Sequence, residues 1–281
     1  MSRTPLAPFL HPEGFAQPAL RAVLAEGRLT AEMARLAARS VQDRRTRSAT
    51  PYAGRPPERS TEPVVLVPGF LAGDVSLRLM SAMLRRNGYR SYRSHIHANV
   101  GCTLNAAAQL EQRLEWVAQR RGSRVRIVGH SLGGMLARGL AVRRPDLVSG
   151  IVTLGSPMLA PAAHHALLSR SVDVLVRLSR AGVPGLMAED CVAGECARMS
   201  WEESREPVPA GVGFTAVYSR RDGIVDWRAC VDPLAEAVEV TASHVGMAVD
   251  PRVMDEVLAA LRRQAAGQAD SLLEVDGGVG A

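Results

Sequence analysis

Short apolar runs alternate along the chain with segments whose apolar residues recur at helical spacing. The runs that predict strands lie at residues 64–67, 89–96, 125–128, 151–154, 214–218 and 237–240. The segments that predict amphipathic helices lie at residues 18–43, 75–86, 104–120, 132–143 and 251–265. Wholly apolar runs suit strands buried on both faces of a sheet. The alternation therefore predicts an α/β fold, with a mostly parallel sheet flanked by helices.

Three segments fall outside this alternation and suggest how the chain is divided. Residues 1–62 hold the first helix and a linker rich in proline and arginine, and we expect them to form an N-terminal extension. Residues 63–270 form the main domain. Residues 158–210 interrupt the alternation without a strong strand, which predicts an inserted helical cap with an apolar helix at about 165–180. Residues 271–281 are expected to be a mobile tail.

The composition is that of a globular protein, since 47% of the 281 residues are hydrophobic and 22% are charged. The net charge of +6 comes from arginines spread along the chain, with a local run at residues 44–47. A nucleic-acid binder usually gathers its charge on one face or arm, so we expect no nucleic-acid partner. No apolar run has the length of a membrane span or a secretory signal, so we expect no membrane insertion and a cytoplasmic location.

The sequence Gly129-His130-Ser131-Leu132-Gly133 follows a predicted strand and begins a predicted helix. A nucleophilic serine on such a strained strand-to-helix turn needs neighbours without Cβ atoms two residues before and after it. Ser131 is therefore the candidate nucleophile.

A serine hydroxyl needs a base to remove its proton, and the base needs an acid to orient it. His244 is the one histidine that follows the last predicted strand, where a parallel sheet carries its site. Asp222 comes first after the strand at 214–218, which makes it the candidate acid, with Asp226 as the alternative. His130 is expected to point away from the serine.

Negative charge on a reacting carbonyl oxygen needs backbone N–H groups to receive it. The N–H of Leu132, which follows the nucleophile, is one expected donor. The second should come from the loop after the first strand, Pro68-Gly69-Phe70-Leu71. Phe70 is the expected oxyanion donor there, with Leu71 as the alternative.

These motifs together resemble the α/β-hydrolase superfamily, and specifically its small bacterial lipases and esterases. The similarity covers roughly residues 63–263 and implies the α/β-hydrolase fold, acyl-ester chemistry and no cofactor. The chain departs from larger members in lacking their first two strands, and Pro68-Gly69 stands where many such lipases have His-Gly. The expected function is a serine hydrolase that cleaves small hydrophobic carboxylic esters through Ser131, His244 and Asp222. The alternatives are an acyltransferase with the same residues and a non-catalytic binding protein.

Cys191 and Cys196 bracket four residues in the predicted cap. They either form a small loop disulfide, which would indicate export, or remain two free thiols, which the lack of a visible signal favours. Zinc is not expected, because the surrounding sequence holds no further Cys or His pair. Cys102 and Cys230 are interpreted as isolated structural cysteines.

Overall fold

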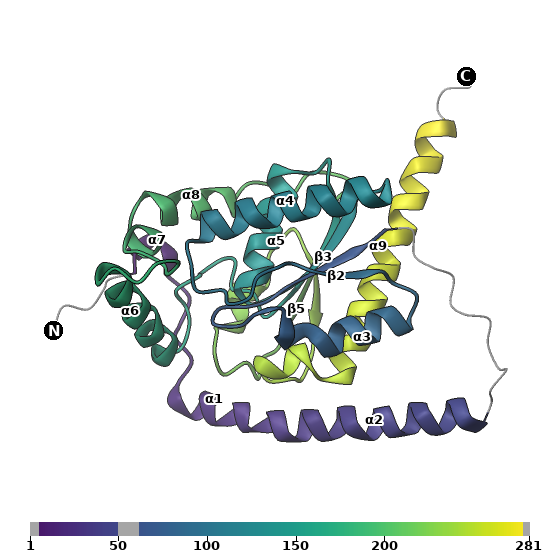
Figure 1. Cartoon of the computed structure of the whole chain (residues 1–281), viewed down its shortest axis with the longest axis horizontal. Helices are drawn as coiled ribbons and strands as arrows, with labels where there is room; N and C mark the ends of the chain where they lie inside the picture. Colours follow the sequence, from purple (N-terminus) through teal and green to yellow (C-terminus); the bar gives the residue numbers. More distant parts are fainter. Residues whose placement is uncertain (1–5, 50–61, 278–281) are drawn as a thin grey trace.

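The computed structural model describes residues 6–49 and 62–277, and all six of its strands run parallel in one sheet (Figure 1). The order across the sheet is β2-β1-β3-β4-β5-β6. The strands are β1 (Val64–Val67), β2 (Ser91–Arg93), β3 (Val125–His130), β4 (Val148–Leu154), β5 (Gly213–Tyr218) and β6 (Glu236–Glu239). The four middle strands are largely buried, whereas β6 is an exposed edge strand. The predicted α/β class and parallel sheet are confirmed.

Helices cover both faces of the sheet, which explains why the central strands are apolar on both sides. One face packs against α3 (Arg78–Arg86) and α9 (Pro251–Gly277), through residues such as Met80 and Leu261. The other face packs against α4 (Thr103–Arg121) and α5 (Leu132–Arg143), through residues such as Leu114 and Leu140. Figure 1 shows these two helical layers on opposite sides of the strands.

Three helices from the segment between β4 and β5 gather at one end of the sheet. They are α6 (Ala166–Arg180), α7 (Asp190–Ala193) and α8 (Glu195–Glu203). In Figure 1 they lie together on the left, away from α9. Their buried residues include Val176, Val192 and Trp201, so this segment has a small apolar core of its own.

The N-terminal helices pack along the main domain. The helices α1 (Leu20–Leu24) and α2 (Leu29–Ala49) are joined by a 3-10 turn, η2 (Ala25–Arg28), that contains Gly27. In Figure 1 they run along the bottom of the domain. Arg35 forms an ion pair with the buried Asp250 at 2.8 Å, next to the start of α9.

Some expected boundaries are wrong for identifiable physical reasons. The last helix continues past residue 265 to Gly277, so residues 271–277 are helical where a tail was expected. The helix expected over residues 75–86 begins instead with a 3-10 turn, η3 (Asp74–Leu77), and the Asp74 carboxylate accepts hydrogen bonds from Ser94 and His95 after β2. Most of the expected linker, residues 50–61, lies outside the described residues. No helix among the described residues is long and apolar enough to cross a membrane.

Candidate active site

Ser131 stands on a sharp turn between β3 and α5 with φ 52° and ψ −122°. Such a left-handed backbone is costly for a residue with a side chain and is typical of a nucleophile elbow. A Cβ on Gly129 would lie 2.5 Å from the Gly133 carbonyl oxygen, and one on Gly133 would lie 2.2 Å from the Val67 carbonyl oxygen. The two glycines are therefore required by the close approach of strand and helix.

The carboxyl ends of β5 and β6 bring Asp222 and His244 together. The His244 Nδ1–H donates to Asp222 Oδ2 at 2.7 Å, and both residues are buried. The other carboxylate oxygen of Asp222 accepts the N–H groups of Ile224 and Val225, which fixes its orientation. With its proton on Nδ1, the neutral His244 ring leaves Nε2 free to accept a proton.

Two opposing effects set the pKa of His244. Burial of the ring favours the neutral form. The negative charge of Asp222, its hydrogen bond and the charge of Glu26 outweigh burial and raise the pKa of His244 above its ordinary value. The imidazolium that forms when His244 accepts a proton is therefore stabilised by its surroundings.

The carboxylate of Asp226, the alternative acid, binds groups other than His244. Its carboxylate is bound by the Arg228 guanidinium at 2.6 Å and by the Ala16 N–H at 2.8 Å. Burial would raise the pKa of Asp226, but these hydrogen bonds and the charge of Arg228 lower it. Of the two candidate acids, the structure brings only Asp222 to His244.

His130 lies between the elbow and the loop that carries His244. Its Nε2 is 2.9 Å from the His244 carbonyl oxygen, and because a carbonyl only accepts, the His130 proton is on Nε2. Burial, followed by the positive charge that His244 can carry, lowers the pKa of His130 to about 4. His130 is therefore a neutral donor that connects Ser131 to the histidine loop, a contact that its sequence position does not reveal.

Ser131 and His244 do not form a hydrogen bond with each other in this structure. Among the described residues, no hydrogen bond connects Ser131 Oγ to the His244 ring. Catalytic hydrogen bonds in ligand-free enzymes are often long and tighten only when substrate is bound. The structure therefore shows the contact between His244 and Asp222, and the contact between Ser131 and His244 is left to the proposal below.

The loop after β1 provides backbone donors beside the elbow. The Leu71 N–H, at a residue with φ 61°, donates to the Asn99 carbonyl oxygen at 3.1 Å, so it is occupied. The N–H groups of Phe70 and Leu132 have no protein acceptor within the described part of the chain. Asn99, which is buried, also donates its Nδ2 to the Pro68 carbonyl oxygen at 3.0 Å and holds the loop in place. Sequence reasoning did not identify Asn99.

Ser131 opens into a cavity of about 140 Å³ whose lining is mainly apolar. The cavity is bordered by Phe70 and Met135 from the sheet domain. Its other walls come from the cap segment, through Leu168, Val172, Met187 and Trp201, and from the N-terminal segment, through Leu6 and Leu10. The sequence left open whether residues 1–62 cover the site, and the structure places part of them against its cavity.

Two glutamates of the N-terminal helices hold the loops that carry Asp222 and His244, and sequence reasoning missed both. Glu26 accepts the N–H groups of Gly223 at 3.0 Å, His244 at 2.9 Å and Val245 at 3.1 Å. Glu32, which is 0% exposed, accepts the N–H and the hydroxyl of Ser243, both at 2.7 Å. One helical segment therefore binds the loops on both sides of the Asp222–His244 pair, although its sequence indicates only an amphipathic helix.

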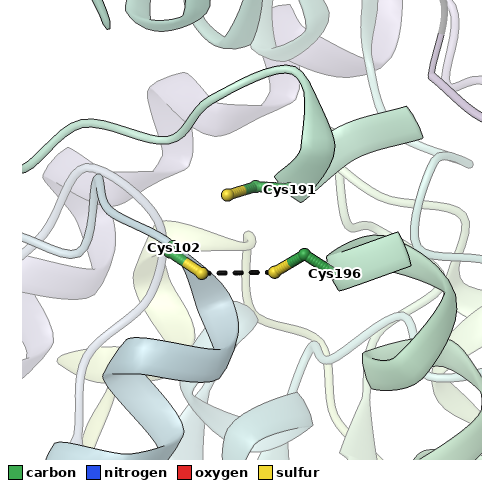
Figure 2. Close-up of side chains that lie close together, drawn as sticks. All are labelled: Cys102, Cys191 and Cys196. Carbon is green, nitrogen blue, oxygen red and sulfur yellow. Dashed lines mark hydrogen bonds between the residues drawn. The ribbon is translucent and has the colours of Figure 1, made fainter. Parts of the chain in front are cut away.

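The expectation for the cysteines needs one correction. Cys102 is not isolated, because its Sγ lies 3.2 Å from that of Cys196, and Cys191 is beside them (Figure 2). All four cysteines are free thiols in the structure, including the buried Cys230. The contact joins residues far apart in the chain, which a search of the neighbouring sequence could not find.

Comparison with known proteins gives one family match and several structural ones. A model of the PGAP1-like alpha/beta domain matches residues 94–176. The mature form of the Bacillus licheniformis lipase BlEst2 is similar at a TM-score of 0.57 and 16% identity, covering 73% of this chain and 93% of the lipase. A structure reported for the metagenome-derived lipolytic enzymes LipS and LipT is similar at a TM-score of 0.50 and 16% identity, covering 74% of this chain and 96% of that one. At such identities the similarity establishes the fold and not the reaction.

Proposed function

We propose that this chain, which has the α/β-hydrolase fold, is a serine hydrolase of hydrophobic carboxylic esters. Ser131 is the nucleophile, His244 the general base and acid, and Asp222 the residue that orients His244. The N–H groups of Phe70 and Leu132 form the oxyanion hole. The observation that carries the proposal is the buried 2.7 Å contact between His244 and Asp222 at the sheet end where the strained Ser131 faces an apolar cavity.

The first half-reaction transfers the acyl group to the enzyme. Ser131 Oγ attacks the ester carbonyl carbon while its proton passes to His244 Nε2. The carbonyl oxygen becomes negatively charged and accepts the N–H groups of Phe70 and Leu132. The carbon–oxygen bond to the alcohol then breaks, His244 returns the proton to that oxygen, and an acyl ester remains on Ser131.

The second half-reaction releases the acid. A water molecule gives one proton to His244 Nε2 while its oxygen attacks the acyl carbon. The bond to Ser131 Oγ breaks, and the serine recovers its proton from His244. The negative charge of Asp222 stabilises the imidazolium in both half-reactions, in agreement with the raised pKa of His244.

The lining of the cavity supports the proposal that the enzyme recognises an apolar acyl group of its substrate. Its walls combine aliphatic and aromatic side chains, and it holds little that could pair with a charged substrate. His164, a buried residue of the cavity wall, has its pKa lowered by burial and is therefore neutral at pH 7. An apolar acyl chain gains free energy when it leaves water for such a cavity.

The test is hydrolysis of a series of p-nitrophenyl esters whose acyl chains increase in length. We expect kcat/KM to rise with chain length until the cavity is filled, because each buried methylene contributes about 0.8 kcal/mol. Ser131→Ala, His244→Ala and Asp222→Asn should each reduce kcat by about 10³-fold or more. Asp226→Asn and His97→Ala are matched controls, since Asp226 binds Arg228 and His97 is exposed. Both should retain activity.

Adding an acceptor alcohol separates hydrolysis from acyl transfer. Release of acid as the main product supports the hydrolase, whereas a new ester formed at the expense of the acid would assign an acyltransferase with the same residues. Folded protein that cleaves none of the esters, or Ser131→Ala that keeps full activity, would refute the proposal.

A further inference from the structure

Three cysteines that the proposed reaction does not use meet where the cap contacts the sheet domain. Cys102 precedes α4, Cys191 lies in α7 and Cys196 in α8 (Figure 2). Their three sulfur atoms all lie within 4.8 Å of one another, and those of Cys102 and Cys196 are 3.2 Å apart. Cys191 also borders the cavity that Ser131 faces.

We infer that Cys102, Cys191 and Cys196 form a binding site for one thiophilic metal ion, Zn(II), which fastens the cap to the sheet domain. Zn(II) bonds thiolate sulfur at about 2.3 Å, so tetrahedral geometry separates two bound sulfurs by about 3.8 Å. The sulfurs of Cys102 and Cys196 are closer than this, at 3.2 Å. No sulfur–sulfur distance among the three cysteines exceeds 4.8 Å. Sulfur shifts of well under 1 Å would therefore bring all three onto one ion.

A disulfide fits the same side chains less well. Its sulfurs are about 2.05 Å apart, so the Cys102–Cys196 pair would have to close by more than 1 Å from 3.2 Å. A disulfide would also leave Cys191 unpaired beside it, whereas a metal ion uses all three sulfurs. In Figure 2 the side chains of Cys102 and Cys196 point toward one another, and the sulfur of Cys191 lies beside this pair.

The backbone around the cluster holds the three sulfurs in this arrangement. The Asp190 carboxylate accepts the N–H of Glu195 at 2.9 Å and that of Cys196 at 3.2 Å, which fixes the turn between α7 and α8. Cys102 sits at the N-terminal end of a 19-residue helix. The Met187 N–H donates to the Val100 carbonyl oxygen at 2.9 Å and keeps the cap against the segment that leads to Cys102.

A bound ion would act on the cap and not on the reacting ester. It would connect α4 of the sheet domain to α7 and α8, two short helices that wall the cavity. Because the ligands come together only in the folded protein, binding stabilises that state. This inference does not depend on the proposed hydrolase activity.

The experiment uses the full chain, freed of metal by a chelator, kept reduced by a phosphine reductant that contains no thiol, separated from the chelator and then titrated with Cd(II). Cadmium replaces zinc at thiolate sites and gives an ultraviolet sulfur-to-metal charge-transfer band. We expect the band to saturate at one Cd(II) per chain and the melting temperature to rise on binding. Zinc should also be found at about one ion per chain when the protein is purified without chelators.

Matched variants identify the ligands. Cys230→Ser should bind like the wild type, because Cys230 is buried outside the cluster. Cys102→Ser, Cys191→Ser and Cys196→Ser should each weaken Cd(II) binding by more than about tenfold. Serine is a favourable residue at the helix end where Cys102 lies, so Cys102→Ser should fold normally, as circular dichroism of the metal-free protein would check.

Three results would overturn the inference. The first is absence of saturable binding to the wild type. The second is equal binding by the wild type and the three cluster variants. The third is a zinc-free protein in which peptide mapping finds a Cys102–Cys196 disulfide, which would make the cluster a redox pair.

Discussion

Replacing Glu26 by alanine should reduce catalysis by loosening the loops that carry Asp222 and His244, while leaving the residues of those loops unchanged. The change removes three hydrogen bonds that hold the loops after Asp222 and around His244, with lengths of 2.9 to 3.1 Å. Water can reach part of this region, so we assign each bond the ordinary net value of about 1 kcal/mol, or about 3 kcal/mol in all. We expect the free energy of unfolding to fall by about 2–3 kcal/mol.

The kinetic effect should fall on kcat and leave KM nearly unchanged. Glu26 holds the backbone of the base and its neighbouring loops, whereas the cavity walls lie on other residues. If the looser loops raise the activation free energy by about 2 kcal/mol, kcat falls by about 30-fold. The measurement is ester hydrolysis at saturating and limiting substrate, together with denaturant unfolding.

A second variant separates charge from hydrogen bonding. Glu26→Gln keeps one acceptor oxygen, which can serve the N–H groups of Gly223 and His244, loses the oxygen that accepts the Val245 N–H, and removes the negative charge that helps to raise the pKa of His244. The acidic limb of kcat/KM should therefore move to lower pH. Asp255→Asn is the control, because it removes only the exposed ion pair of Arg39 at a distant point of α2. A Glu26→Ala enzyme with wild-type kcat and an unmoved pH profile would refute this account of the N-terminal helices.

Three further predictions follow from the site. Because the pKa of His244 is raised and the base must be neutral, kcat/KM should fall as pH drops through a value above about 6.5, and a limb well below it would contradict the assignment. Gly133→Ala should lower stability by about 3 kcal/mol or more in thermal unfolding, because its Cβ would lie 2.2 Å from the Val67 carbonyl oxygen, and an unaffected variant would refute the close approach. Leu168→Trp should narrow the cavity and reduce kcat/KM for long acyl esters by about fourfold per excluded methylene while sparing acetate esters.

The elements that could be predicted from the sequence are those decided by local patterns. The apolar runs of β1 and β4 indicate buried parallel strands, and both are completely buried. Gly122 adopts φ 62° and ends α4 near where the helical pattern stops. The turn at Ser131 was also predictable, since its glycines are required by sterics within a few residues.

The parts that the sequence could not give depend on contacts between distant residues. Glu26 and Glu32 contact the loops that carry Asp222 and His244 from about two hundred positions away, with separations of 197 to 219 residues. Cys102 meets Cys196 across 94 residues. The order of residues after the strand at 214–218 favours Asp222 over Asp226, but the reason that Asp226 is unavailable, its contacts with Arg228 and Ala16, depends on the folded structure.

Labelling with a fluorophosphonate probe tests the central claim most directly, because the probe reacts with an activated serine whatever the natural substrate is. We predict stoichiometric labelling of the wild type, loss of labelling in Ser131→Ala and in His244→Ala, and retained labelling in His97→Ala. Mass spectrometry should find the phosphonyl group on the peptide that contains Ser131. A folded protein that the probe does not label, or labels on another serine, would contradict the account.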